Sequence, residues 1–387
     1  MAEIKNIKKA ATRIKRAVKN QERIILYGDA DLDGACSVVI LKEAMASLGA
    51  RPTALYFPDR EAEGYGITRK GLKTLRSHAP ALLVVMDLGI SNFEEVKEAK
   101  KLGFEVVIVD HHEILNGKVP EASIVVDPKQ PGDSYPFKTF AASGLTFRLA
   151  ELLLGKLLSP SLRAALAELA ALGTIADMMP REQDNLEIIQ EGLATMERTW
   201  RPGLRALWEF PSIAELFSFE NRVYRAISIL NVRDVEDGVP GAFRLLAAPT
   251  EEEARELTTH LAAKNEVRQE TIKALVDEAH ERVKGRGGER VVFEDFSGVD
   301  CVLLGSAASV LSKDLDKPVF LYKEAPKECI GSARAPKGYN TVEAMASCAE
   351  LLEDYGGHPP ASGFRFKTKN TEKFGECLHK YFRSHKV

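Results

Sequence analysis

The sequence has few cysteines, no long apolar run and little net charge, and each shortage excludes a class of protein. Its five cysteines are scattered and form no C-x-x-C pair, which argues against a disulfide framework or a zinc site and for a reducing compartment. No apolar run approaches the roughly 18 residues of a membrane span, and the basic N-terminus lacks an apolar signal core, so we expect a cytoplasmic protein. With a net charge of −3, any contact with nucleic acid must come from local patches.

Two kinds of catalytic motif are also missing. There is no Gly-x-x-x-x-Gly-Lys-Ser/Thr loop, so chemistry driven by ATP is not expected. No serine or cysteine stands in a nucleophile elbow, the strand-to-helix turn that exposes such a residue for covalent catalysis. The chemistry must therefore come from other side chains, and the 387 residues leave room for two or three domains.

Short apolar segments that end in acidic residues recur in the first third of the chain. Buried strands are predicted at 24–27, 81–86, 104–109 and 123–127, and helices at 35–48 and 93–102. This alternation predicts an α/β fold with a mainly parallel sheet flanked by helices. The carboxyl ends of parallel strands meet at one edge of a sheet, so the polar residues that follow these strands should converge there. They are Asp29, Asp31, Asp33, Asp87, Asp110, His111 and His112.

Two parts of this predicted cluster also have a simpler interpretation. Asp29, Asp31 and Asp33 repel one another unless a cation neutralises them, and an acidic helix cap is the alternative. An EF-hand is excluded, because a strand precedes the turn and no Glu closes a twelve-residue loop. The Asp-His-His triplet at 110–112 could by itself be a capped strand exit with two solvated histidines.

Carboxylates dominate the predicted cluster, and imidazole is the minority ligand. Asp177 follows an apolar helical segment, where a carboxylate is costly unless it is paired or binds metal; capping the next helix is its alternative role. The mixture suits Mn²⁺ or Mg²⁺ better than a thiolate-preferring metal. Five or more ligands exceed the needs of one ion and indicate two ions that share a bridging carboxylate. The residues alone therefore predict metal-assisted phosphoester hydrolysis.

The sequence from residue 141 onward predicts further helices and then a second α/β unit. Residues 141–200 are expected to be largely helical, and 250–284 form a long charged helical stretch without Pro or Gly. Strands are expected in the last hundred residues at ERVVFEDF, DCVLLG and KPVFLYK. We therefore place a catalytic domain at 1–249, a helical connector at 250–288 and a smaller substrate-binding domain at 289–387.

Two further groups of residues could contact phosphate. Gly356, Gly357 and His358 could form a loop whose backbone N–H groups approach a phosphate, with Arg334 supplying charge, although a simple turn explains the loop equally well. The helical segment 4–18 carries a basic face that could touch phosphates, and a solvated helix face is the alternative.

Four motifs in order, GDADLDG, VVMDLG, VIVDHH and ALGTIADMMP, resemble those of the DHH phosphoesterase superfamily. More narrowly, the chain resembles the RecJ-like single-strand nucleases, with supporting matches such as FPDREAEGYGIT. The segment GSARAPKGYN and the later GGHPPASGF resemble the DHH-associated C-terminal domain. The likeness covers almost the whole chain, and it implies an active site in the cleft between the two domains.

The resemblance also implies residue roles. Two Mn²⁺ or Mg²⁺ ions would be bound, with Asp87 as the bridge, by Asp31, Asp33, Asp87, His111 and Asp177. Asp29 and Asp110 would be further ligands or would orient His111. His112 would contact the scissile phosphate or assist proton transfer, and the catalytic candidates are His112, Asp110 and Asp33. The substrate would be held by Arg334, Gly356, Gly357 and His358. Tyr135 and Phe137 could stack on bases or belong to the core.

Some segments depart from the family pattern. RAISILNVRDVEDG keeps only Asn231 and a displaced Arg233 of the usual P-R-I-N-A-x-G-R, and SGVDCVLLGSAASVL lacks the His of W-H-x-G-V-V-G-I. The chain also ends without room for the OB-fold of longer RecJ proteins. We therefore expect a compact, archaeal-like form with a weaker grip on single strands.

Three functions are compatible with these observations. The first is a two-metal exonuclease that degrades single-stranded DNA, or RNA, in the 5′→3′ direction and releases mononucleotides. The second is a phosphodiesterase for short oligoribonucleotides, cyclic dinucleotides or nucleoside bisphosphates. The third is a non-catalytic scaffold of a replication complex. Single-stranded nucleic acid is the expected partner, together with replication or repair proteins, and the oligomeric state is open.

Overall fold

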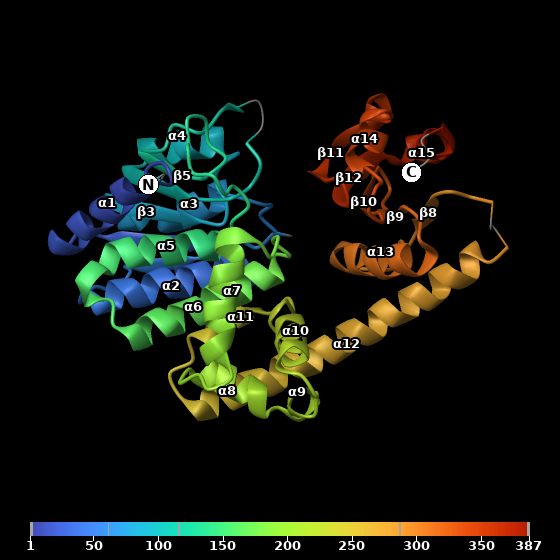
Figure 1. Cartoon of the computed structure of the whole chain (residues 1–387). Helices are drawn as coiled ribbons and strands as arrows, with labels where there is room; N and C mark the ends of the chain where they lie inside the picture. The colour runs from blue at the N-terminus through green and yellow to red at the C-terminus, as the bar shows by residue number, and fades with distance from the viewer. Residues whose placement is uncertain (1–2, 61, 115–116, 286–287, 385–387) are drawn as a thin grey trace. The chain divides into compact units, whose positions relative to one another are not determined.

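The chain folds into two compact units, Met1–Asn265 and Glu266–Val387. The computed structural model describes residues 3–60, 62–114, 117–285 and 288–384 (Figure 1). The boundary between the units falls inside one long helix, α12 (Glu251–Val283), which covers the stretch predicted as a helical connector. The proposed domain limits at 249 and 289 remain predictions. In the part of the chain that is described, no helix has both the length and the apolarity that crossing a membrane requires.

The N-terminal unit is built on a five-stranded sheet in the order β2-β1-β3-β4-β5, and every pairing in it is parallel. The strands are β1 (Ile24–Gly28), β2 (Ala54–Tyr56), β3 (Ala81–Met86), β4 (Phe104–Val109) and β5 (Ile124–Val126). The aliphatic runs of β1 and β3 are buried throughout, as a strand covered on both faces requires. The α/β fold with a mainly parallel sheet is therefore confirmed. The strand order reverses between β1 and β3, the position where such sheets bind ligands.

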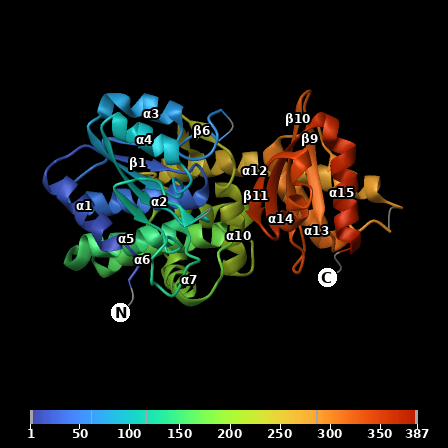
Figure 2. The same ribbon diagram turned by 90° about the horizontal axis from the view of Figure 1, so that it is seen from above.

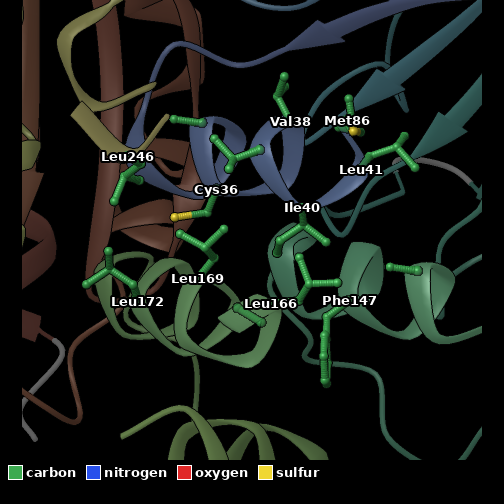
Figure 3. Close-up of a cluster of buried hydrophobic side chains, with 14 of the residues drawn as sticks. Cys36, Val38, Ile40, Leu41, Met86, Phe147, Leu166, Leu169, Leu172 and Leu246 are labelled. Atoms are coloured by element: carbon green, nitrogen blue, oxygen red, sulfur yellow. The ribbon is translucent and has the colours of Figure 1, made fainter. Parts of the chain in front are cut away.

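Helices cover both faces of this sheet (Figure 2). On one face pack α3 (Arg69–Leu75) and α4 (Phe93–Lys101). On the other face lie α1 (Ile7–Lys19), α2 (Leu32–Ser47) and α5 (Ala142–Leu154), with α6 (Pro160–Ala176) and α7 (Gln183–Met196) stacked beyond them. Ile40 of α2, Phe147 of α5 and Leu166 of α6 meet in the main hydrophobic core (Figure 3).

Residues 201–248, which sequence patterns did not resolve, form short helices and one hairpin. These elements are α8 (Pro202–Glu209), α9 (Pro211–Ala214), α10 (Phe219–Leu230), β6 (Val235–Glu236), β7 (Val239–Pro240) and α11 (Gly241–Leu246). Phe137 is buried in the main core, and the Tyr135 hydroxyl donates to Asp184, so the core interpretation holds for both aromatics. Single 3₁₀ turns occur at Arg76–His78, Gly155–Leu157, Ala349–Leu351 and Thr368–Asn370.

The C-terminal unit has a second five-stranded sheet, in the order β11-β12-β10-β9-β8. Its strands are β8 (Val292–Asp295), β9 (Val319–Glu324), β10 (Glu328–Arg334), β11 (Leu352–His358) and β12 (Ala361–Lys367). Among the strands that the structure describes in this sheet, β8 and β9 pair in parallel and the other pairings are antiparallel. The helices are α13 (Cys301–Leu315), α14 (Thr341–Ala346) and α15 (Thr371–Ser384). A smaller second α/β unit is therefore confirmed.

Three local predictions for this unit are wrong. DCVLLG is not a strand but the start of α13, because its apolar residues continue at helical spacing and bury Leu304, Ala308 and Leu311. Gly356 and Gly357 lie in strand β11 rather than in a loop, paired with β12. Although the sequence argued against a disulfide framework, Cys348 and Cys377 are joined by a disulfide with their Cα atoms 6.1 Å apart. Folding brings these two cysteines together from 29 positions apart, which spacing alone could not show.

Candidate metal centre

The predicted cluster lies at the carboxyl edge of the first sheet, next to the point where the strand order reverses. Asp29 follows β1, Asp87 follows β3 and the triplet 110–112 follows β4. Among the described residues, three groups of side chains could hold a metal ion, and within each group the candidate ligand atoms lie within 4.8 Å of one another. They are Asp87, His111 and His112; Asp33, His111 and Asp177; and Asp29, Asp31 and Asp87. The structure therefore brings together the predicted ligands, while their roles remain predictions.

Asp87 lies at the middle of this cluster. It is 2% exposed, and its backbone adopts a left-handed φ of 64°, which Asp tolerates better than most residues. Its Oδ1 lies 3.2 Å from His111 Nε2, and the same nitrogen lies 3.5 Å from Asp177 Oδ2. Burial is the main cause that raises the pKa of Asp87 well above its ordinary value, and the charges of Asp31 and Asp33 add to it. Asp87 and His111 each belong to two of the three groups, and of these two Asp87 has the pair of carboxylate oxygens that a bridging ligand needs.

The neighbouring ligands show the same crowding of buried carboxylates. Burial, with the charges of Asp33 and Asp31, raises the pKa of Asp177 to about 8. Burial raises the pKa of Asp33 to about 6, and burial together with the charge of His112 lowers that of His111 to about 4. The raised pKa values of Asp33 and Asp177 are the response expected of a site that needs added positive charge, and the lowered pKa of His111 keeps its imidazole in the neutral form that binds metal.

Asp33 is anchored by the start of another helix. Its Oδ2 accepts the N–H of Ala142 at 2.7 Å and its Oδ1 that of Ser143 at 3.1 Å, in the first turn of α5. Gly173 of α6 packs directly against this pair: a Cβ there would lie 2.3 Å from Ser143 Oγ and 2.5 Å from Asp33 Oδ1. The glycine of the ALGTIAD motif is therefore required by the position of Asp33.

Asp110 and His112 form a hydrogen-bonded pair at the edge of the cluster. Asp110 is fully buried and accepts four hydrogen bonds, from the backbone N–H groups of Ile90, His111 and His112 and from His112 Nδ1 at 2.7 Å. Burial raises the pKa of Asp110, but the hydrogen bond and charge of His112 outweigh it and lower the pKa to about 2. The same contact outweighs the effect of burial on His112 and raises its pKa to about 9. Asp110 thus orients the ring of His112 rather than that of His111.

Two residues near the cluster were not assigned a role from the sequence. Arg60 Nε lies 2.8 Å from Asp29 Oδ1, and its Nη2 lies 2.5 Å from Asp29 Oδ2 and 2.8 Å from Asp31 Oδ2. The Tyr65 hydroxyl lies 3.1 Å from His112 Nε2. Both belong to FPDREAEGYGIT, which matched the family pattern, but no spacing rule connects this segment with Asp29 or His112.

Arg60 leads to a prediction about the metal-free protein. Its guanidinium is bound to carboxylate oxygens that a cation would need, so we expect it to stabilise the empty cluster and to compete with divalent ions. Arg60→Ala should lower the Tm in EDTA and increase the rise in Tm that Mn²⁺ produces, as measured by thermal unfolding. Arg69→Ala, which removes an exposed arginine paired with Glu98, is the control. Equal Mn²⁺-induced shifts in wild type and Arg60→Ala would contradict this competition.

The donor set fits hard divalent cations. Carboxylate oxygens with a minority of imidazole nitrogens suit Mg²⁺ and Mn²⁺. His111 Nδ1 and Asp177 Oδ2 are buried and have no hydrogen-bond partner among the described residues. Buried polar atoms normally have such partners, so these two atoms point to a further ligand at the cluster.

Asp127, which follows β5, is a buried carboxylate outside the three groups. Its Oδ1 accepts the N–H of Lys129 at 2.7 Å, and its Oδ2 has no hydrogen-bond partner in the described ranges. Burial is the main cause that raises the pKa of Asp127 to about 7 from 3.8, and the charge of Asp110 adds to it.

This shift predicts a pH-dependent stability. Between these two pKa values the folded protein keeps a proton that the unfolded chain releases, so stability falls as pH rises. Asp127→Asn abolishes this titration, so its Tm advantage over wild type should grow from about pH 4 to about pH 7 and then stay constant. Thermal unfolding at several pH values in EDTA measures it. A difference in Tm that does not change with pH would contradict the assignment.

The substrate-binding candidates lie in the C-terminal unit. Arg334 ends β10, where burial lowers the pKa of its guanidinium and Nη1 donates to Ala333 O at 2.9 Å. A Cβ at Gly357 would lie 2.5 Å from Ala361 O, so close pairing with β12 explains this glycine. Gly356 pairs with Gly363. The backbone of His358 ends β11, and its side chain lies outside the described residues. A shared cleft with the metal centre stays a prediction.

Two family models match the chain. The DHH family N-terminal domain matches residues 23–174, and the DHHA1 domain matches residues 288–384. The fold and the acidic cluster thus define an α/β protein with a candidate metal centre at the carboxyl edge of its parallel sheet. The chain belongs to the DHH family and is RecJ-like.

Relatives and solved structures agree with this family. The chain is 35% identical over 374 residues to the single-stranded-DNA-specific exonuclease RecJ of Bacillus subtilis, covering 95% of this chain and 46% of the relative. It is 32% identical to RecJ of Thermus thermophilus, in a match that covers 93% of this chain and 52% of that relative. It therefore spans about half the length of these curated relatives. A RecJ crystal structure with bound manganese matches with a TM-score of 0.79 at 27% identity, covering 99% of this chain and 96% of that one. The structure of Thermus thermophilus RecJ in complex with Mn²⁺ matches with a TM-score of 0.83 at 26% identity. This match covers 99% of this chain and 55% of that one.

Proposed function

We propose that the chain is a Mn²⁺- or Mg²⁺-dependent exonuclease that hydrolyses single-stranded DNA in the 5′→3′ direction and releases mononucleotides. The observation that supports it most is the close approach of Asp87, His111 and Asp177, where His111 Nδ1 and Asp177 Oδ2 have no hydrogen-bond partner within the described ranges. The named substrate of the relatives and the Mn²⁺ or Mg²⁺ bound in related RecJ structures support the same proposal. Dinucleotide hydrolysis and a non-catalytic scaffold are not favoured.

The proposed ligands of the two ions are Asp29, Asp31, Asp33, Asp87, His111 and Asp177. Bound ions of this kind activate a water molecule and stabilise the charge that develops at phosphorus. Asp87, shared by two of the groups, would bridge the ions. Asp33 would hold its place through the N–H groups of α5.

His112 has a different role in this proposal. With a pKa raised to about 9, its imidazole is a cation at neutral pH, and Asp110 holds Nδ1. Nε2 is then free of Asp110 and can donate a hydrogen bond or a proton to a phosphate oxygen. Arg334, Gly356, Gly357 and His358 remain proposed contacts to the substrate.

An assay over labelled substrates tests the proposal. With Mn²⁺ present, we expect a 3′-labelled single strand to shorten progressively while a 5′-label is released at once as a mononucleotide. A duplex, a cyclic dinucleotide and a nucleoside bisphosphate should be poor substrates. Faster turnover of the dinucleotide than of a long strand would overturn the proposal in favour of the short-substrate phosphodiesterase. Absence of any metal-dependent hydrolysis would favour the scaffold.

The remaining proposals concern the cellular setting. Single-stranded nucleic acid is the proposed partner, and contacts with replication or repair proteins and a cytoplasmic location stay predictions from the sequence. Mass photometry would determine the oligomeric state.

A further inference from the structure

The basic helix at the N-terminus has no role in the proposed chemistry. Its exposed side chains are all basic except for one threonine: Lys8, Lys9, Thr12, Lys15, Arg16 and Lys19. The whole chain has 53 basic and 56 acidic residues, so composition alone does not produce a helix face with six exposed positions and no acid. A solvated face remains the simplest interpretation unless the structure shows a concave site beside it.

Such a concave site exists. An open pocket of about 470 Å³ lies between α1 and the first residues of β4 and β5. Lys9, Thr12 and Arg16 line it from α1, and their spacing of three and four positions places them on one face of the helix. Glu105 of β4 and Ser123, just before β5, line the opposite side.

Arg13 forms the wall of this pocket rather than its binding group. It is 9% exposed, and its guanidinium binds both oxygens of Glu105, at 2.8 and 2.7 Å, and Glu22 at 2.6 Å. The hydrogen bond from Arg13 lowers the pKa of Glu105, so this carboxylate stays ionised and faces the positive charge of Arg13. Arg13 Nη1 is buried and has no hydrogen-bond partner within the described ranges. The lining is thus left with positive charge and one unpartnered buried donor.

Four other polar groups of the pocket are available to a ligand, whereas Lys8, which also lines it, is paired with Glu3. Among the residues that the structure describes, the side chains of Lys9, Arg16, Thr12 and Ser123 have no ion-pair or hydrogen-bond partner. Two cations and two hydroxyl groups around a concave surface match the needs of a phosphodiester, whose oxygens accept hydrogen bonds and carry one negative charge.

We propose that this basic pocket, formed by Lys9, Thr12, Arg16 and Ser123, binds a backbone phosphate of the single strand far from the metal centre. The inference rests on the proposed function, because it takes its ligand from the same substrate. Glu105 is the second residue of β4 and Asp110 directly follows this strand, so the two lie five residues apart, or roughly 16 Å. At a rise of roughly 3.4 Å per stacked nucleotide, one strand needs about five nucleotides to span that distance. The pocket therefore adds affinity for long strands only.

Charge reversal tests this pocket. The double variant Lys9→Glu/Arg16→Glu should bind a single-stranded 20-mer about tenfold more weakly in EDTA, measured by fluorescence anisotropy, with a salt dependence about 0.7 shallower in log–log slope, the value for one lost phosphate contact. Its binding and turnover of a 4-mer should equal those of wild type. Lys73→Glu/Arg76→Glu, an exposed pair at α3 on the other face of the sheet, is the matched control and should change neither substrate.

The outcomes separate the two proposals. Unchanged 20-mer affinity and salt slope in the α1 variant, with normal hydrolysis, would overturn the basic pocket and leave the proposed function intact. An equal loss on the 4-mer would also overturn it, since the effect would then not depend on length. If wild-type protein neither binds nor hydrolyses any strand, the proposed function fails, and the pocket loses its ligand with it. Retained 20-mer affinity together with binding of an acidic peptide would assign the pocket to a protein partner and overturn the proposal.

Discussion

Asp87→Asn is expected to lower the rate of single-strand hydrolysis in Mn²⁺ by about 10³-fold, equivalent to about 4 kcal/mol of lost transition-state stabilisation. The reason is geometric: Asp87 belongs to two of the three ligand groups, so its substitution removes a carboxylate ligand from both of these groups. Asn keeps the volume of the side chain, and it tolerates the left-handed φ of 64° at this position. The measurement is single-turnover cleavage of a labelled oligonucleotide.

The same substitution should not destabilise the metal-free protein. Burial and the neighbouring carboxylates raise the pKa of Asp87 well above its ordinary value, so the charged form is unfavourable in the folded state. Removing the charge should leave the Tm in EDTA at neutral pH equal or higher, while the rise caused by Mn²⁺ disappears. Asp184→Asn, which changes a carboxylate held by Tyr135 and Arg148, is the control and should retain hydrolysis. Normal cleavage by Asp87→Asn would contradict the metal centre.

The sheet and its acidic edge could be predicted because the signals are local. In β1, β3 and β4 an aliphatic run stops at a carboxylate, and parallel pairing then dictates that the ends of these runs lie together. Asp29, Asp87 and Asp110 could therefore be assigned to one edge without knowledge of any contact. Asp177 lies one residue beyond the end of α6, and its long apolar helix gave a comparable signal.

The contacts that the sequence did not show depend on the path of the chain between elements. Arg60 reaches Asp29 from a segment between β2 and α3, and nothing in the spacing of that segment specifies its direction. The expectation that the acidic cluster is intolerable without metal needs the same correction, because Arg60 supplies part of the positive charge. The prediction of a strand at DCVLLG was wrong for another reason: a short apolar run fits a strand and a buried helix equally well.

Gly173→Ala tests whether the packing of α6 against Asp33 holds this carboxylate in place at the metal centre. Alanine is the better helix former by about 1 kcal/mol, so propensity alone predicts a more stable α6. The added Cβ would nevertheless meet Ser143 Oγ at 2.3 Å and Asp33 Oδ1 at 2.5 Å, distances that require Asp33 to move. We expect Mn²⁺ affinity, measured by calorimetry, to fall about 10–100-fold, as it does when groups that orient metal ligands are changed, and hydrolysis at limiting Mn²⁺ to fall with it.

The neighbouring helix provides a matched control for this substitution. Gly144 of α5 is also helical and buried, but a Cβ there would meet Ile188 Cδ1 only at 3.4 Å, an ordinary contact. Gly144→Ala should therefore keep the Mn²⁺ affinity of wild type. Equal affinities for Gly173→Ala and Gly144→Ala would show that the cluster tolerates displacement of Asp33, and Asp33 could then not be a ligand held in place by α5 and α6.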